Sequence, residues 1–236
     1  MNKMILTFII LVINVATTNE APISFDWREN GIISNALRQN VIDTNWADSI
    51  ITMLESIYAL HKGKYIKFSR QMLIDCIPQE SDFIGDQIET ALKWIIRNGI
   101  TKDEDYPYNR LVSFCRKSEY IDMKVTYYRN LGPTADEEEM KKFLYENGPF
   151  IVLINSTPLS TYSSGIFDSN GLKCPSSGIN QACILVGYGN SSGIDYWSVK
   201  NSWGKSWGES GYFRITRGKG TCGLNYSPYI VTVKFE

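Results

Sequence analysis

The chain has 236 residues and is close to electroneutral, with 24 Lys and Arg, 25 Asp and Glu and a formal net charge of −1. A hydrophobic content of 43% with 21% charged residues is typical of a globular protein, and the net charge supplies no electrostatic footprint for nucleic acid or an anionic membrane. One histidine and five cysteines, with no CxxC or HxxxH spacing, exclude a zinc site of the usual kind, so no metal or cofactor is expected.

The first 18 residues have the composition of a secretory signal peptide. Lys3 precedes the apolar run Met4–Ile13, and small or polar residues follow it. A run of about 10 residues is too short to span a bilayer. We therefore expect a signal peptide over residues 1–18, with cleavage between residues 17 and 21. The mature chain would be secreted, or delivered to a lysosome-like compartment, and would not stay in a membrane.

Entry into the secretory pathway has two further consequences. The five cysteines would lie in an oxidising compartment, where disulfide bonds form. Three Asn-x-Ser/Thr sequons would become candidate glycosylation sites, at Asn155, Asn190 and Asn225.

Helical patterns fill the first half of the mature chain. Residues 46–60 are apolar around most of a helix circumference, which predicts a buried central helix over 45–61 that starts after Asp43 and Thr44 and stops at Gly63. Shorter helices are expected over about 69–75 and 86–97. A further helix should follow the acidic residues 136–139 and end at Asn147-Gly148-Pro149.

From Phe150 onward, short β-branched and aromatic runs alternate with Gly, Ser and Asn, which predicts antiparallel strands. The expected strands cover residues 150–154, 182–187, 196–200, 212–216 and 229–234. The fold class is therefore α+β, with a helical lobe over 21–130, a β-rich lobe over 131–236 and a seam near 130–134. No feature of the sequence indicates an oligomeric state.

Several ordered blocks resemble the papain-like cysteine proteases, the cathepsin L-like family of peptidase C1 type. The blocks are residues 22–28 (PISFDWR), 69–76 (SRQMLIDC), 106–108 (YPY), 196–204 (YWSVKNSWG) and 207–212 (WGESGY). The resemblance covers about residues 21–236. It implies a helical lobe and a β-barrel-like lobe that face each other across a substrate cleft, with the N-terminus crossing onto the second lobe.

In that family a cysteine at the start of the central helix is the nucleophile, and a histidine on the opposite lobe activates it. The resemblance places Gln39 at the oxyanion-binding glutamine, Asn45 at the nucleophile and Gln181 at the histidine, and it finds the family's residues at Asn201 and Trp203. A carboxamide is neither a nucleophile nor a general base at neutral pH. The alignment therefore excludes covalent catalysis at this site, and the two facing carboxamides could instead hydrogen-bond and close the cleft.

Two other residues could in principle replace the missing groups. His61, the one imidazole, follows Asn45 by 16 residues, which is roughly 24 Å along a continuous helix. Cys183 lies next to Gln181 but within an apolar run, where a free cysteine behaves as a small buried hydrophobic residue. Neither is expected to serve the site.

The resemblance also bears on the cleft and on the cysteines. Where the family has a Gly-Gly pair that binds peptide backbone, this chain has Gly85 and Asp86, and the Asp86 side chain should crowd or charge that place. Asp48 likewise replaces an aromatic residue. The family's disulfide pattern leaves Cys183 free and implies two bonds, Cys76 with Cys115 and Cys174 with Cys222.

We therefore predict a secreted papain-fold pseudoprotease that binds peptides, protease inhibitors or another protein partner. Two alternatives stay open: a cysteine-type peptidase or other enzyme with non-standard site residues, and a structural, storage or degenerate product. Only a few residues separate the expected signal peptide from Pro22, whereas the family carries a long propeptide. Its absence fits a protein with no activity to restrain, although a truncated gene would look the same.

Overall fold

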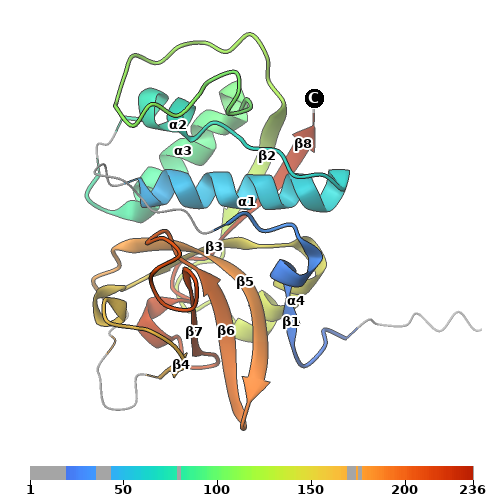
Figure 1. Ribbon diagram of the computed structural model, residues 1–236, viewed down its shortest axis with the longest axis vertical. Helices are drawn as coiled ribbons and strands as arrows, with labels where there is room; N and C mark the ends of the chain where they lie inside the picture. Colours follow the sequence, from blue (N-terminus) through green and yellow to red (C-terminus); the bar gives the residue numbers. More distant parts are fainter. Residues whose placement is uncertain (1–19, 36–43, 79–80, 169–173, 175–176, 236) are drawn as a thin grey trace, which may run out of the picture.

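A computed structural model describes residues 20–35, 44–78, 81–168, 174 and 177–235. The expected signal peptide and Gln39 lie outside these described residues. Figure 1 shows the helices α1, α2 and α3 gathered in one half of the molecule and most of the sheet in the other. These halves are called the helical lobe and the β-rich lobe, and together they give the predicted α+β class.

Helix α1 (Asn45–Lys62) lies between the two lobes and packs on strands β3 and β5. Its side chains are buried around most of its circumference, as the sequence predicts. Thr44 precedes the first turn, and its hydroxyl donates to Asp48 Oδ2 at 3.2 Å. The helix ends where Gly63 adopts φ 67° and its N–H donates to the Ala59 carbonyl, a left-handed conformation that glycine takes without strain.

Helices α2 and α4 begin at side chains that cap them. Ser69 accepts from the Met72 N–H at 3.0 Å at the start of α2, and Asp136 accepts from the Glu138 N–H at 2.8 Å at the start of α4. Helix α3 begins two residues before the predicted position. The bounds are α2 (Arg70–Cys76), α3 (Ile84–Asn98) and α4 (Glu137–Asn147).

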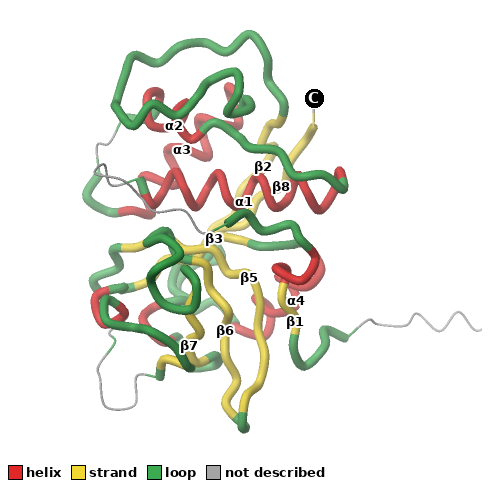
Figure 2. The backbone as a smooth tube through the Cα atoms, in the orientation of Figure 1, coloured by secondary structure: helices red, strands yellow, loops and turns green. Residues whose placement is uncertain are grey.

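The strands form one sheet in the order β2-β8-β3-β5-β6-β7-β4, with β1 paired to β5. The N-terminal segment thus crosses onto the β-rich lobe, where Phe25 pairs with Tyr188. Figure 2 shows the long β5–β6 hairpin at the end of the molecule opposite the helical lobe. The bounds are β1 (Phe25–Asp26), β2 (Met123–Asn130), β3 (Phe150–Ile154), β4 (Ile166–Phe167), β5 (Gln181–Ser191), β6 (Ile194–Lys200), β7 (Tyr212–Thr216) and β8 (Tyr229–Phe235).

Strand β2 is the one long strand that the sequence analysis did not predict. It precedes the predicted seam at 130–134, pairs antiparallel with β8 and contacts α3. The sheet therefore draws on residues from both sides of that seam, and β2 with β8 joins the lobes.

Both disulfide bonds that the resemblance implies are present. Cys76 and Cys115 close a sequence separation of 39 residues, and Cys174 and Cys222 close one of 48. Cys183 is free and buried. Within the described residues, no helix has the length and apolar character needed to cross a membrane.

Candidate functional site

Two carboxamides that are far apart in the sequence meet between the lobes. Asn45 is the first residue of α1 and Gln181 the first residue of β5, and α1 packs on β5. Asn45 Nδ2 donates to Gln181 Oε1 at 3.2 Å. The structure therefore brings together the two residues that the resemblance aligns with the family's nucleophile and base.

Gln181 also bonds to a third carboxamide, that of Asn201, which directly follows strand β6. Gln181 Nε2 donates to Asn201 Oδ1 at 2.9 Å and to Ser202 Oγ at 3.0 Å. The Ser202 N–H also donates to Asn201 Oδ1, at 2.8 Å. The antiparallel pairing of β5 with β6, in which Ile184 faces Lys200, sets this juxtaposition. We call Asn45, Gln181 and Asn201 the carboxamide chain.

The carboxamide chain is closed to solvent. Asn45 is 2% exposed, Gln181 3% and Asn201 2%. A hollow of about 20 Å³ borders Asn201 and Ser202, which is room for about one water molecule. Asn45 Oδ1 and Asn201 Nδ2 are buried and have no hydrogen-bond partner within the described part of the chain. The geometry provides neutral donors and acceptors, and none of the three side chains can attack a carbonyl or accept a proton.

Neither of the two residues that could replace the nucleophile or the base, Cys183 and His61, is placed to do so. Cys183 Sγ donates to Asn201 Oδ1 at 3.7 Å, and burial strongly raises the pKa of this thiol, so thiolate is not available at neutral pH. His61 lies in the last turn of α1, where its ring packs against Phe235 with centroids 5.6 Å apart. Since α1 is continuous from Asn45, the imidazole stands about 24 Å from the carboxamide chain.

The residues aligned with the peptide-binding pair sit in a helix. Gly85 and Asp86 belong to the first turn of α3, where the Asp86 N–H donates to Phe83 O at 3.1 Å and Gly85 O accepts from the Tyr229 hydroxyl at 3.3 Å. Gly85 is buried, and the exposed Asp86 carboxylate accepts from Ser81 Oγ. These backbone groups are already paired, so an extended peptide cannot use them without displacing existing bonds.

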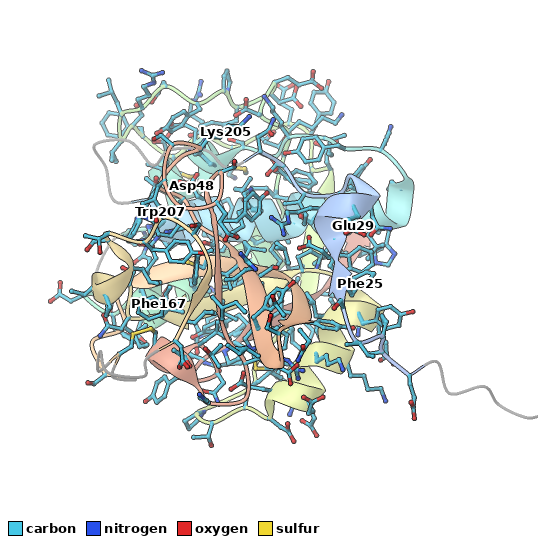
Figure 3. All side chains as sticks on the ribbon, turned by 60° about the horizontal axis from the view of Figure 1, so that its bottom comes forward. Phe25, Glu29, Asp48, Phe167, Lys205 and Trp207 are labelled. Atoms are coloured by element: carbon cyan, nitrogen blue, oxygen red, sulfur yellow. A yellow bond between two sulfur atoms is a disulfide. The ribbon has the colours of Figure 1, made fainter. Side chains whose placement is uncertain are left out.

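Trp203 follows the carboxamide chain in the sequence and is half-buried. Its ring packs edge-on against Trp207, with centroids 4.8 Å apart. Figure 3 shows Trp207 and Asp48 as sticks, on the loop after β6 and on α1 respectively. The two indole rings therefore present an aromatic surface at this edge of the site.

A cluster of charged side chains lies along α1 beside the carboxamide chain. Asp48 Oδ1 pairs with Arg70 at 2.7 Å, and Lys200 Nζ donates to Ser34 at 2.8 Å and to Thr52 at 3.3 Å. Glu55 accepts from the Tyr65 hydroxyl and from the Phe68 N–H. A cavity of about 480 Å³ borders Asp48, Glu55 and Arg70. Neither Glu55 nor Lys200 was predicted from the sequence, although a carboxylate in a helix that is apolar all round indicates a buried charge.

Burial shifts the protonation of this cluster. It raises the pKa of Glu55 to about 7, against the opposing bonds from Tyr65 and Phe68. It lowers the pKa of Lys200 to about 8, against the opposing charges of Glu55 and Asp48. Burial also raises the pKa of Asp48, while Arg70 opposes that shift. In each of these groups burial therefore disfavours the charged form.

The Glu55 shift predicts a fall in stability as pH rises. Its pKa moves from an ordinary 4.5 to about 7, so between these values the folded chain holds a proton that the unfolded chain releases. The contribution of Glu55 to the free energy of unfolding is fully present below pH 4.5. It is lost as the pH rises through 7, by at most about 3 kcal/mol in all. Glu55→Gln should flatten the decline, as measured by the free energy of unfolding in denaturant at several pH values.

The matched control for this prediction is Glu104→Gln, because the Glu104 side chain is exposed. It should keep the pH dependence of the unmutated chain. An unchanged decline in Glu55→Gln would contradict the assignment of that proton to Glu55.

The three sequon asparagines differ in access. Asn155 is buried, with Nδ2 donating to Ser177 O at 2.9 Å, so the folded chain leaves no room for a glycan there. Asn225 is half-buried and donates to Ala135 O at 3.2 Å. Asn190 is exposed near the tip of the β5–β6 hairpin, as a glycan requires.

Comparison with known proteins gives one consistent result. Residues 21–232 match the sequence profile of the family described as "Papain family cysteine protease". A viral cathepsin of Adoxophyes honmai nucleopolyhedrovirus is 35% identical over 209 residues, covering 88% of this chain and 60% of the relative. The P34 probable thiol protease of Glycine max is 35% identical over 218 residues, covering 87% and 57%.

A solved structure of a papain-like proteinase also matches this chain. The digestive procathepsin L2 proteinase of the Tenebrio molitor larval midgut superposes with a TM-score of 0.80 at 30% identity, covering 91% of this chain and 69% of that one. The chain thus spans about 60% of the length of the curated relatives that it matches.

Proposed function

The chain belongs to the papain family of cysteine proteases, and we propose that it is a member that binds a peptide or protein partner without cleaving it. In this proposal Asn45 and Gln181 stand in place of the family's nucleophile and general base, and Asn201 keeps the residue that orients that base.

The hydrogen-bonded carboxamide chain carries the proposal. A peptidase of this family needs a thiolate and an imidazole within hydrogen-bond reach of each other, and the thiolate must reach the carbonyl carbon of the peptide. Here the corresponding atoms are amide groups joined at 3.2 Å and 2.9 Å, and they are buried. None of these amide groups is a thiolate or an imidazole, and their polar atoms are bonded to one another.

The partner that the scaffold suits best is a proteinaceous protease inhibitor, because such an inhibitor recognises the shape of a papain-like molecule and needs no reaction. The aromatic edge formed by Trp203 and Trp207 offers a rigid contact surface beside the closed site. Binding of this kind would withdraw an inhibitor from active relatives. The helical conformation at Gly85 and Asp86 argues against an extended peptide as the main ligand.

A competition experiment tests this function. An active papain-like protease is inhibited with a cystatin-type inhibitor, and the unmutated chain is then added in excess. We expect protease activity to return as the inhibitor is withdrawn, and Trp203→Ala should reduce that recovery by about tenfold or more, as for an interface hot spot. The control Ile194→Ser, at the tip of the β5–β6 hairpin, should behave as the unmutated chain. No recovery at any excess would contradict the inhibitor as partner.

The N-terminal pattern and the disulfides support a location in the secretory pathway. Residues 1–18 have signal-peptide composition, and disulfide bonds persist in oxidising compartments. We therefore propose that the protein acts outside the cell or in a lysosome-like compartment.

A further inference from the structure

The β5–β6 hairpin carries one of the three sequons at its tip. Asn190 lies near the end of β5, and the two residues that join the strands, Ser192 and Gly193, have φ values of 53° and 81°, both positive as in a type I′ turn. Residues 190–195 are all exposed. Figures 1 and 2 show the hairpin tip at the end of the molecule farthest from the helical lobe. The whole sequon is therefore open to solvent.

The contacts of the Asn190 amide are compatible with a linked sugar. Nδ2 donates to Asp195 Oδ1 at 2.8 Å, and Oδ1 accepts from the Gly193 N–H at 3.1 Å. Nδ2 carries two hydrogens, and a glycosidic bond replaces one of them. The other hydrogen can still be donated to Asp195, which is itself paired with Arg217 at 3.2 Å. A sugar can therefore be linked to Asn190 without breaking either bond.

The sequon at Asn155 lies inside the β-rich lobe. Asn155 is 7% exposed. Its Nδ2 donates to Ser177 O at 2.9 Å, its Oδ1 accepts from the Thr157 N–H at 3.2 Å, and its own N–H donates to Cys222 O at 2.9 Å. A sugar chain on this side chain would have to displace packed neighbours. A chain modified at Asn155 would therefore not reach this fold.

The sequon at Asn225 is partly enclosed. Asn225 Oδ1 packs against Gly220, where an added Cβ would lie 2.6 Å from it, and Nδ2 donates to Ala135 O at 3.2 Å. The hydroxyl of this sequon, on Ser227, is buried and accepts from Asn130 Nδ2 at 2.8 Å. A cavity of about 620 Å³ borders Asn225. Asn225 is therefore the strongest competitor of Asn190 as a modified residue.

We propose that Asn190 carries an N-linked glycan and that the other two sequons stay unmodified in the folded protein. The proposal rests on the secretory location inferred above. In the linking step, a bond forms between Asn190 Nδ2 and C1 of the first sugar. The bond between that C1 and a phosphate oxygen of a lipid-linked oligosaccharide diphosphate breaks. Nδ2 loses one proton, and the lipid diphosphate leaves.

The glycan stands apart from the carboxamide chain. Gln181 is the first residue of β5, and Asn190 follows it by nine residues, which is roughly 30 Å along a strand. A glycan at Asn190 therefore leaves the closed site uncovered. It covers the hairpin tip instead, where Ile194 is 43% exposed.

Peptide mapping tests the site with the full chain. The chain, with its own N-terminal segment, is expressed in eukaryotic cells that secrete glycoproteins. It is then treated with peptide-N-glycosidase F, which converts a glycosylated Asn to Asp. We expect Asp at position 190 and Asn at positions 155 and 225, whereas the untreated sample carries a sugar mass at position 190. Treatment should also give a single step in gel mobility.

Two matched variants at the hairpin tip separate loss of the sequon from a change in the hairpin. Ser192→Asn removes the sequon hydroxyl and places Asn-Gly in the turn, the pair that a type I′ turn favours. It should lose the mobility step and keep the unfolding curve of the glycosidase-treated unmutated chain. Ser191→Ala alters the neighbouring residue but keeps the sequon, and it should keep the step. A mobility step that survives Ser192→Asn would overturn the proposal.

The remaining outcomes distinguish the site from the location. An exported chain with both disulfide bonds formed and Asn190 unmodified would overturn the site alone. A chain that stays in the cytosol without a glycan would contradict the secretory location as well. A glycan at Asn225 or Asn155 in place of Asn190 would overturn the choice among the sequons. All these results are independent of the inhibitor competition experiment, in which the glycosidase-treated chain should compete as the glycosylated chain does.

Discussion

The chain carrying both Asn45→Cys and Gln181→His is expected to cleave a fluorogenic peptide, with each single variant at least about 10³-fold less active. The two substitutions supply a thiol at the N-terminus of α1 and an imidazole on β5, at side chains that already touch across 3.2 Å. A helix N-terminus and a nearby imidazolium both lower the pKa of a thiol. Asn201 Oδ1, now 2.9 Å from Gln181 Nε2, is in place to accept from the new imidazole.

Neither single change should suffice. Asn45→Cys alone places a thiol beside a carboxamide that cannot take its proton, and Gln181→His alone provides a base without a nucleophile. A further Asn201→Ala in the double variant should lower activity, because the imidazole loses its orienting bond. A folded but inactive double variant would contradict the alignment of these positions with the family's catalytic pair.

The largest loss of stability is expected for Glu137→Ala, about 3–5 kcal/mol of unfolding free energy. Glu137 is buried at the start of α4. Its Oε2 accepts from the Trp197 indole at 2.6 Å and from the Gly218 N–H at 2.7 Å, and its Oε1 accepts from the Gly220 N–H at 2.7 Å. Removing the carboxylate leaves three donors unsatisfied, in β6 and in the loop after β7.

Chemical denaturation of the variant and of two controls checks this expectation. Glu139→Ala alters an exposed neighbour on the same helix turn and should change stability by about 0.5 kcal/mol or less. Glu137→Gln keeps one acceptor oxygen and should fall between the other two. Equal stabilities for Glu137→Ala and Glu139→Ala would show that these three bonds contribute nothing.

The helices were predictable because their ends carry local signals. Ser69 and Asp136 cap α2 and α4, and Gly63 ends α1, so the sequence contains the reason for each boundary. The start of α3 was less well placed. Phe83 precedes it with no capping side chain, and the helix begins two residues earlier than predicted.

Strand β2 was not predicted because the strand that pairs with it lies far away in the sequence. Its pairing with β8 joins Met123 to Phe235 at one end and Asn130 to Tyr229 at the other. Only Met123 and Val125 are fully buried along it. An eight-residue segment with a mostly exposed face gives weak periodicity, and the partner that stabilises it lies at the far end of the chain.

The carboxamide chain and the charge cluster show what residue identity can and cannot predict. The resemblance predicts which residues occupy the site, and the chemistry of a carboxamide then predicts that the family reaction does not take place there. The buried charges of Glu55 and Lys200 follow from the packing of α1 against the sheet, which aligns residues on different elements. No local sequence pattern predicts this packing of α1 against the sheet.

The most direct test of the central claim is peptidase activity of the unmutated chain. It is measured on a fluorogenic peptide beside the folded Asn45→Cys/Gln181→His variant as the positive control. We predict no turnover above the buffer blank for the unmutated chain and clear turnover for the double variant. Peptide cleavage by the purified unmutated chain, persisting after removal of traces of other proteases, would contradict the proposal that this papain-family protein acts by binding alone.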